Sequence, residues 1–279
     1  MTGSLADKII SDVLADLEKD QLLLPTLPEV AIRVRDTIED ENAGTTEVAS
    51  VIMTDAALSA RLIQIANSPL LRAPMAIESV EMAVSRMGAN MVRNLVTSIA
   101  MEQMFQATTD ASDKLLRNLW EHSTEVAAIS HALTSQFTKL QPDQALLAGL
   151  VHDIGALPII TRAEDIPELL ANEPLLVKVI HETHARVGQA ILSKWNFPAN
   201  IVAVAAEHEN LNRNSPATDY VDVVTVANLQ SYVGTEHPLT KQDWSKVPAF
   251  AKLGLDPGIN VVEMDETSEA IEAIKLALT

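Results

Sequence analysis

Residues 141–155 read QPDQALLAGLVHDIG, an apolar helical segment that closes on a His-Asp pair. Pro142 suits a first helical position, and Gly155 suits the left-handed residue that follows a helix. Pro158 then prevents the helix from continuing. The stretch therefore predicts an apolar helix whose last turn carries the His-Asp pair.

The environment of this pair, His152 and Asp153, is unfavourable for a free carboxylate. The side chain of Asp153 faces the negative end of the helix dipole, and the apolar run beside it implies little water. An ionised Asp153 therefore needs a cation or strong hydrogen-bond donors. A bound metal with His152 as a second ligand would meet that need. Hydrogen bonds from a histidine or from capping backbone amides would also meet it, so the pair alone leaves both interpretations open.

The composition is that of a globular protein with a substantial core. The chain has 279 residues, of which 47% are hydrophobic, and it has no cysteine, which excludes disulfides and thiolate metal sites. The longest uninterrupted apolar run is far shorter than a membrane span. The N-terminus shows neither a basic region nor an apolar region typical of export signals. We therefore expect a cytoplasmic protein without a membrane partner.

The charge balance argues against a nucleic-acid partner. Lys and Arg number 20 against 38 Asp and Glu, which gives a net charge of −18, and aromatic residues are 3% of the chain. Such a surface repels phosphate backbones and offers few rings on which bases could stack. A small anionic ligand would need local positive charge from a metal or a helix N-terminus.

Helical periodicity and helix caps recur along nearly the whole chain, and no convincing period-two alternation is present. We therefore predict an all-α fold. The expected helices lie at about residues 29–38, 45–52, 55–67, 78–87, 91–105, 112–137, 142–153, 174–194, 198–209, 217–233 and 266–278.

The short polar break at Thr108–Ser112 is the best candidate for a domain boundary. It divides an N-terminal helical subdomain (residues 1–110) from a second helical subdomain (111–233), which a C-terminal helical extension (234–279) follows. All seven histidines lie at or beyond His122. The first subdomain therefore offers no imidazole as a metal ligand or as an acid–base group.

Four predicted helices of the second half each carry one polar residue on an otherwise apolar stripe. These residues are His122, His184, His208 and Asn228. A single histidine on an apolar face is usually a hydrogen-bonded core residue. Four such residues beside the His-Asp helix are harder to explain in that way, because buried polar groups need partners. The simplest partners are one another or one shared ion, so we predict that the four converge.

Short motifs over roughly residues 22 to 233 resemble the HDOD domain of bacterial signalling proteins. They are LPTLPEV (24–30), DAAL (55–58), ANS (66–68), IESV (77–80), AVSRMG (83–88), EHS (121–123), HDIG (152–155), HARVG (184–188) and WNFP (195–198). The resemblance implies an HD-like helical bundle in the second half and a role in signal transduction.

HDOD domains are similar to the HD superfamily of metal-dependent phosphohydrolases and to its HD-GYP branch, which cleaves cyclic-di-GMP. In that superfamily an early histidine, the His-Asp pair and a later aspartate hold a metal. The resemblance places these functions at His122, His152, Asp153 and Asn228. The further HD-GYP ligands would fall at Asn118, His184, Glu207 and His208.

Four departures weaken the case for catalysis. Asn228 replaces the last aspartate and is a neutral, weaker ligand. Asn118 stands where HD-GYP proteins carry a glutamate, and Ala156 stands where they carry a lysine that assists phosphate chemistry. The chain also lacks the Asp-Gly-x-Gly-Tyr-Pro loop after His208. Cleavage of cyclic-di-GMP is therefore not expected. A metal site formed by His122, His152 and Asp153, together with His184 or His208, is still compatible with the sequence.

Two classes of function follow. The first is a non-catalytic regulatory module that acts on a signalling protein or through a small anionic ligand. The second is a metal-dependent phosphohydrolase of a small phosphoester or nucleotide, in which Asp153 would bridge the metal and a nucleophilic water. The cofactor is either a divalent transition metal such as iron, manganese or zinc, or none, in which case the histidines are structural. We favour the first class, because the ligands and the lysine that catalysis requires are incomplete.

Overall fold

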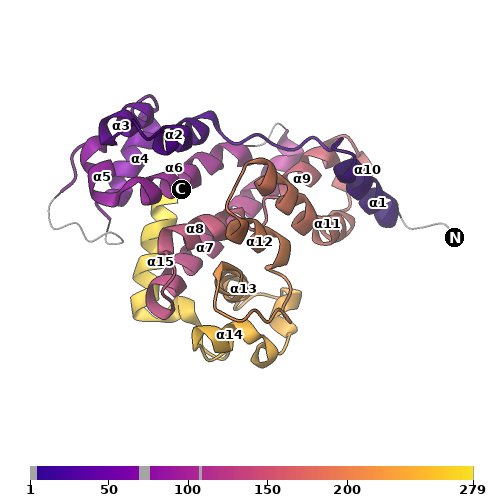
Figure 1. Cartoon of the computed structure of the whole chain (residues 1–279). Helices are drawn as coiled ribbons and strands as arrows, with labels where there is room; N and C mark the ends of the chain where they lie inside the picture. Colours follow the sequence, from indigo (N-terminus) through magenta and orange to yellow (C-terminus); the bar gives the residue numbers. More distant parts are fainter. Residues whose placement is uncertain (1–4, 69–75, 107–108, 279) are drawn as a thin grey trace.

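The computed structural model describes residues 5–68, 76–106 and 109–278, and every regular element in these ranges is helical (Figure 1). This confirms the all-α prediction. The α-helices are α1 (Leu5–Glu18), α2 (Glu29–Glu39), α3 (Thr45–Ile52), α4 (Ala56–Ala66), α5 (Val80–Met87), α6 (Ala89–Met101), α7 (Asp110–Phe137), α8 (Pro142–Val151), α9 (Ala156–Glu164), α10 (Pro167–Leu170), α11 (Glu173–Lys194), α12 (Ala199–Glu207), α13 (Tyr220–Ser231), α14 (Pro248–Leu253) and α15 (Asp265–Leu278).

Helices α2 to α6 form a group with its own buried residues, from Val34 to Ile99. Side-chain caps start two helices in this group. The Asp55 side chain accepts a hydrogen bond from the backbone N–H of Leu58, and the Ser79 hydroxyl accepts one from Met82. The third predicted helix, expected at about 55–67, is α4 and ends at Ala66.

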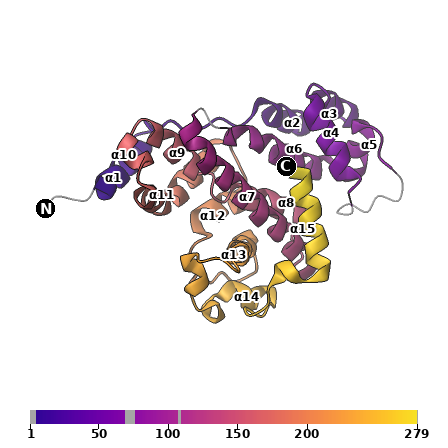
Figure 2. The same cartoon turned by 180° about the vertical axis from the view of Figure 1, so that it is seen from behind.

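Helices α7 and α8 lie at the centre of the molecule, where α7 also packs on α13 and α15 (Figure 2). Gly149 permits the close approach of α8 to α7, because a Cβ at this position would lie 2.7 Å from the Cα of Ala127. Every residue of α8 from Ala145 to Val151 is buried. The apolar helix therefore forms the middle of the core, and the side chains at its end are held within the protein.

One helical stretch of the described chain, Pro142–Glu164, is long and apolar enough to cross a membrane by length and composition alone. In this structure 83% of its most apolar window is buried inside the protein. Its apolar surface is therefore used for packing, as in the core helix of a globular protein.

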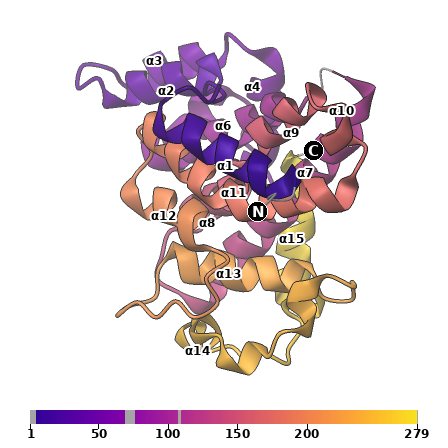
Figure 3. The same cartoon turned by 90° about the vertical axis from the view of Figure 1, so that its right-hand side faces the viewer.

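The two terminal helices connect distant parts of the chain. Helix α1, which the periodicity did not predict, buries Ile9 and Val13 against the second half of the protein and lies along α11 (Figure 3). Helix α15, predicted near 266–278, packs on α7 and reaches α4. The division of the chain near residues 110 and 233 stays a prediction, and its polar break falls partly on residues 107–108, outside the described part.

Candidate metal site

The His-Asp pair lies where the apolar helix ends. Helix α8 stops at Val151, and His152 is its C-terminal cap. The expectation of a left-handed Gly155 is wrong, because Gly155 has φ −67° and ψ −15°. Pro158 also does not end the helical region; it lies in the first turn of α9, where proline is tolerated. The chain turns at Asp153 and continues directly into another helix.

Four imidazoles surround the carboxylate of Asp153. The Nε2 atoms of His208 and His184 lie 3.2 and 3.5 Å from its Oδ1 atom. The Nε2 atoms of His152 and His122 lie 3.3 and 3.8 Å from its Oδ2 atom. We call these five residues the histidine–aspartate cluster. Its members come from α7, the end of α8, α11 and the end of α12, so the structure brings together the three stripe histidines and the pair.

Backbone carbonyls fix the orientation of three of these rings. The Nδ1 atom of His152 lies 2.6 Å from the carbonyl oxygen of Gly149, and the Nδ1 atoms of His184 and His208 lie 2.9 and 3.0 Å from the carbonyl oxygens four residues before them. A carbonyl oxygen only accepts, so each Nδ1 carries the proton. In the neutral ring each Nε2 then presents a lone pair toward Asp153.

These inward-facing atoms lack hydrogen-bond partners. The Nε2 atoms of His152, His184 and His208 are buried and unpartnered among the described residues. Three lone pairs against a carboxylate are mutually repulsive unless a positive charge lies between them. Fixing the outer nitrogen by a carbonyl is also how proteins orient metal-binding histidines. The donor set therefore fits a divalent metal ion.

The spacing of the cluster is compatible with such an ion. The ligand atoms of His122, His152 and Asp153 all lie within 4.8 Å of one another, and so do those of Asp153, His184 and His208. Asp153 belongs to both groups. Either group could hold a metal.

The electrostatics of the cluster favour an ionised carboxylate at Asp153. Burial raises the pKa of Asp153, but the neighbouring His152, His208 and His184 outweigh burial and hold that pKa well below its usual range. Burial, reinforced by the charge of His152, lowers the pKa of His122 to about 4. A negatively charged carboxylate surrounded by imidazole nitrogens suits a cation.

Two of the other predicted ligands have different surroundings, and the place of Asn228 in the site stays a prediction. Asn118 is exposed on α7, and Glu207 forms an ion pair with Arg213, with Oε2 2.6 Å from Nε. Asn228 is buried on α13, and its Oδ1 atom has no hydrogen-bond partner among the described residues. Ala156, at the lysine position of HD-GYP proteins, is buried in the core.

Three residues near the cluster were not singled out from the sequence. The hydroxyl of Tyr232 lies 3.2 Å from Nε2 of His122, and its ring stacks on His237 at a centroid distance of 3.7 Å. Oε2 of Glu209 lies 3.7 Å from Nε2 of His184. In the sequence Tyr232 is the last residue of the apolar stripe of the predicted helix 217–233. His237 and Glu209 lie beyond the ends of helices, so helical periodicity could not point to them.

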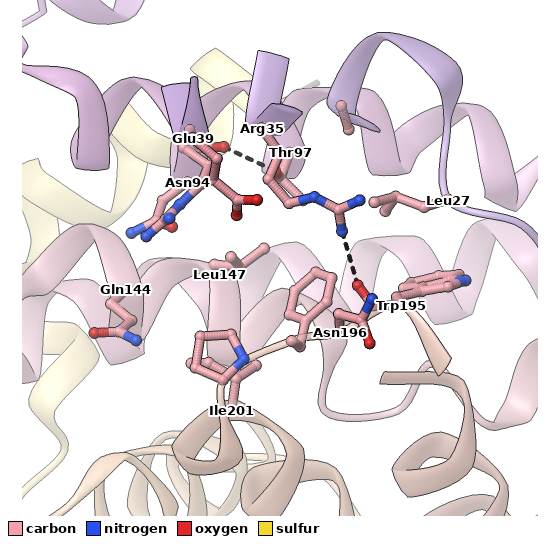
Figure 4. Close-up of a pocket in the computed structure, with 14 residues that line it drawn as sticks. Leu27, Arg35, Glu39, Asn94, Thr97, Gln144, Leu147, Trp195, Asn196 and Ile201 are labelled. Carbon is pink, nitrogen blue, oxygen red and sulfur yellow. Dashed lines mark hydrogen bonds between the residues drawn. The ribbon is translucent and has the colours of Figure 1, made fainter. Parts of the chain in front are cut away.

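A separate pocket of about 120 Å³ opens between the N-terminal helices and the second half (Figure 4). Arg35 and Glu39 of α2 line one wall, while Leu147 and Ile201 line the opposite one. Nη1 of Arg35 donates to the backbone oxygen of Trp195 at 2.9 Å. None of the described residues that line this pocket belongs to the histidine–aspartate cluster.

Comparisons with known proteins show which family and which folds this chain resembles. The model of the HDOD domain family matches residues 24–211. A solved protein from Shewanella amazonensis SB2B, named "Putative metal-dependent phosphohydrolase", is 30% identical with a TM-score of 0.89, over 99% of this chain and 100% of that chain. An HDOD domain protein of unknown function from Geobacter sulfurreducens shares the fold, with 22% identity and a TM-score of 0.61 over 99% and 96% of the two chains.

Two curated relatives are longer than this chain. An uncharacterized protein of Treponema pallidum (strain Nichols) is 26% identical over 205 residues, which are 67% of this chain and 38% of that protein. Ribonuclease Y of Chlorobaculum tepidum is 32% identical over 114 residues, which are 40% of this chain and 18% of that protein. The chain therefore spans less than two fifths of the length of either relative.

Proposed function

This chain belongs to the HDOD domain family, and from that premise we propose that it is a bacterial regulatory module that binds one divalent metal ion and does not catalyse a reaction. The observation that carries the proposal is the set of three buried, unpartnered Nε2 atoms around the carboxylate of Asp153. A fold maintained for packing alone would place apolar side chains there, because each unpartnered polar group costs free energy.

The histidine–aspartate cluster would hold the ion. Imidazole nitrogens with one carboxylate oxygen suit zinc, iron(II) or manganese(II). The three carbonyl bonds to Nδ1 atoms orient the rings before the ion binds, which favours high affinity. We propose that the ion contributes to the stability of the fold, since its ligands come from four different helices.

Among the described residues no Lys or Arg forms an ion pair with Asp153, and this supports a non-catalytic role. Phosphoryl transfer needs positive charge around the phosphate in addition to a metal. Within the described part of the chain, the ion pairs of Asp153 involve histidines alone. The buried Ala156 cannot supply the charge of a lysine. These features favour a protein or small-ligand partner over a reaction.

The net charge of −18 supports a partner other than nucleic acid. Although the name of one relative is Ribonuclease Y, the similarity covers 40% of this chain. We propose that the chain does not bind RNA, and that it acts in the cytoplasm on another signalling protein or on a small anionic ligand.

The second candidate is a metal-dependent phosphohydrolase, and the similarity to the Shewanella amazonensis protein favours it. A bound metal would supply a Lewis acid for a phosphoryl oxygen. In that case Asp153 would hold the ion and orient the attacking water, while His122 and His152 would hold the ion in place.

One assay separates the two candidates. The manganese-loaded protein and its Asp153→Asn variant are incubated with bis(p-nitrophenyl) phosphate, p-nitrophenyl phosphate and a mononucleotide, and product is measured. The non-catalytic proposal predicts equal background rates for both proteins. Turnover by the wild-type protein that disappears in Asp153→Asn would refute it and establish the phosphohydrolase.

A further inference from the structure

The pocket between α2 and α8 has walls that hydrogen bonds between distant segments fix in place. Nη1 of Arg35 donates to the backbone oxygen of Trp195 at 2.9 Å, and Nε1 of Trp195 donates to the backbone oxygen of Pro25 at 3.1 Å. Asn196 follows with φ 56°, a left-handed conformation that asparagine tolerates. The chain turns there after α11, and Phe197 lines the pocket. The pocket is therefore formed by the fold itself, as most small-molecule sites are.

Much of the wall of this pocket is apolar, and its size limits what it can hold. The buried side chains of Leu27, Ala31, Leu147 and Ile201 line it. Its volume of about 120 Å³ is somewhat less than that of a cavity of about 150 Å³ that binds benzene. The pocket therefore suits an aliphatic side chain of about four carbon atoms, and it is too small for a whole nucleotide.

Two side chains of opposite charge line the same pocket without charged partners. Arg93 on α6 is partly buried, and Glu39 on α2 is exposed at the rim, with its side chain pointing toward Leu147 (Figure 4). Neither side chain forms an ion pair or a hydrogen bond with any described residue. The other cation of the pocket, Arg35, already pairs with Asp36 at 3.3 Å. One positive and one negative group therefore remain available to a ligand.

We infer that this pocket binds a free α-amino acid with an aliphatic side chain, such as leucine. The carboxylate of the ligand would pair with Arg93, its ammonium group would pair with Glu39, and its side chain would contact the apolar wall. A simple anion of the same size would be repelled by Glu39, and a simple cation would be repelled by Arg35 and Arg93. A ligand that carries both charges suits the whole lining.

The first test compares three related compounds by isothermal titration calorimetry with the whole chain. L-Leucine carries both charges, 4-methylpentanoate lacks the ammonium group, and 3-methylbutylamine lacks the carboxylate. We expect leucine to bind at least about tenfold more tightly than either of the others, because each missing charge leaves a charged group of the protein unpaired. A smaller preference, or no binding of leucine at millimolar concentration, would overturn the inference.

Variants of the two charged residues then locate the site. Arg93→Gln and Glu39→Gln should each weaken the binding of leucine by at least about tenfold. Arg33→Gln and Glu41→Gln are the matched controls, because both residues are exposed and neither lines the pocket. The two controls should keep the affinity of the wild type. Unchanged affinity in either Arg93→Gln or Glu39→Gln would contradict the inference.

The amino-acid site goes beyond the proposed function and is tested separately from it. None of the described residues that line the pocket belongs to the histidine–aspartate cluster. A protein that binds one metal ion, hydrolyses no phosphoester and does not bind leucine would overturn this inference alone. A protein that binds leucine and hydrolyses a phosphoester would overturn the proposed function alone.

Discussion

A Cβ atom on Gly155 would lie 1.9 Å from the backbone oxygen of His184 and 2.5 Å from the backbone nitrogen of Gly188. The turn that follows the His-Asp pair is therefore in direct backbone contact with α11. This contact brings His184 within 3.5 Å of Asp153. The glycine is required by the close approach of two helices and not by a left-handed conformation.

Gly155→Ala should accordingly be strongly destabilising. Neither backbone can move aside easily, so we expect a loss of about 3 kcal/mol or more in the free energy of unfolding. Urea denaturation followed by circular dichroism measures this loss. Gly258→Ala serves as the control, because its nearest contact is the side chain of Asp256 at 3.3 Å. Equal stability of Gly155→Ala and the wild type would show that α9 and α11 are not in contact.

A buried ion pair ties the C-terminal extension to α13. Asp222 is 1% exposed and accepts hydrogen bonds from Nζ of Lys252 on α14 at 2.9 and 3.1 Å. Lys252→Met would leave this carboxylate with the more distant Arg213 as its cation, 3.5 Å away, beside hydrogen bonds from the Asp219 backbone N–H and the Ser215 hydroxyl. We expect a loss of about 2 kcal/mol in the free energy of unfolding.

The control for this prediction is an exposed pair of the same type. Lys246 pairs with Asp243 at 3.1 Å, and their side chains are 81% and 54% exposed. Lys246→Met should therefore change the free energy of unfolding by less than about 0.5 kcal/mol. Similar effects of the two lysine substitutions would mean that Asp222 does not depend on Lys252.

The stability of the protein should fall on acidification, in part because of His131 on α7. Burial lowers the pKa of His131 to about 4, whereas the unfolded chain titrates at 6.5. Between these values the unfolded state binds more protons, so stability is complete above the unfolded pKa and is lost as the pH falls toward the folded one. From neutral pH to about pH 5 this residue should account for a loss of about 2 kcal/mol.

Comparison of two histidine variants isolates this contribution. His131→Gln should show a shallower pH dependence of the free energy of unfolding than the wild type over this interval. His181→Gln, whose side chain is 66% exposed in the native protein, should follow the wild-type slope. If His131→Gln retained the full slope, the burial of that ring would not limit its protonation.

Much of the cluster was accessible from sequence patterns. His122, His184 and His208 each interrupt an apolar stripe, and the structure brings these rings to the end of α8 as the stripes predicted. Helical periodicity also located α15, although its packing on α4 was not foreseeable. These features depend on local spacing, which a single sequence records.

The remaining features depend on contacts between distant segments. The bond between Tyr232 and His122 spans 110 positions and has no local signal. The contact of Gly155 with α11 is likewise a tertiary effect, so the usual role of glycine after a helix was assigned instead. Helix α1 was missed because only Ile9, Val13 and Ala6 are buried, which is a short apolar pattern.

The central claim is that the histidine–aspartate cluster binds a metal ion, and its most direct test is elemental analysis. The untagged protein should be purified without chelator and without a metal-affinity column, alongside His208→Gln and His131→Gln. We predict about one transition-metal ion per chain in the wild type and in His131→Gln, and almost none in His208→Gln. Folded wild-type protein that is free of metal and takes up no added zinc, iron or manganese would contradict the account.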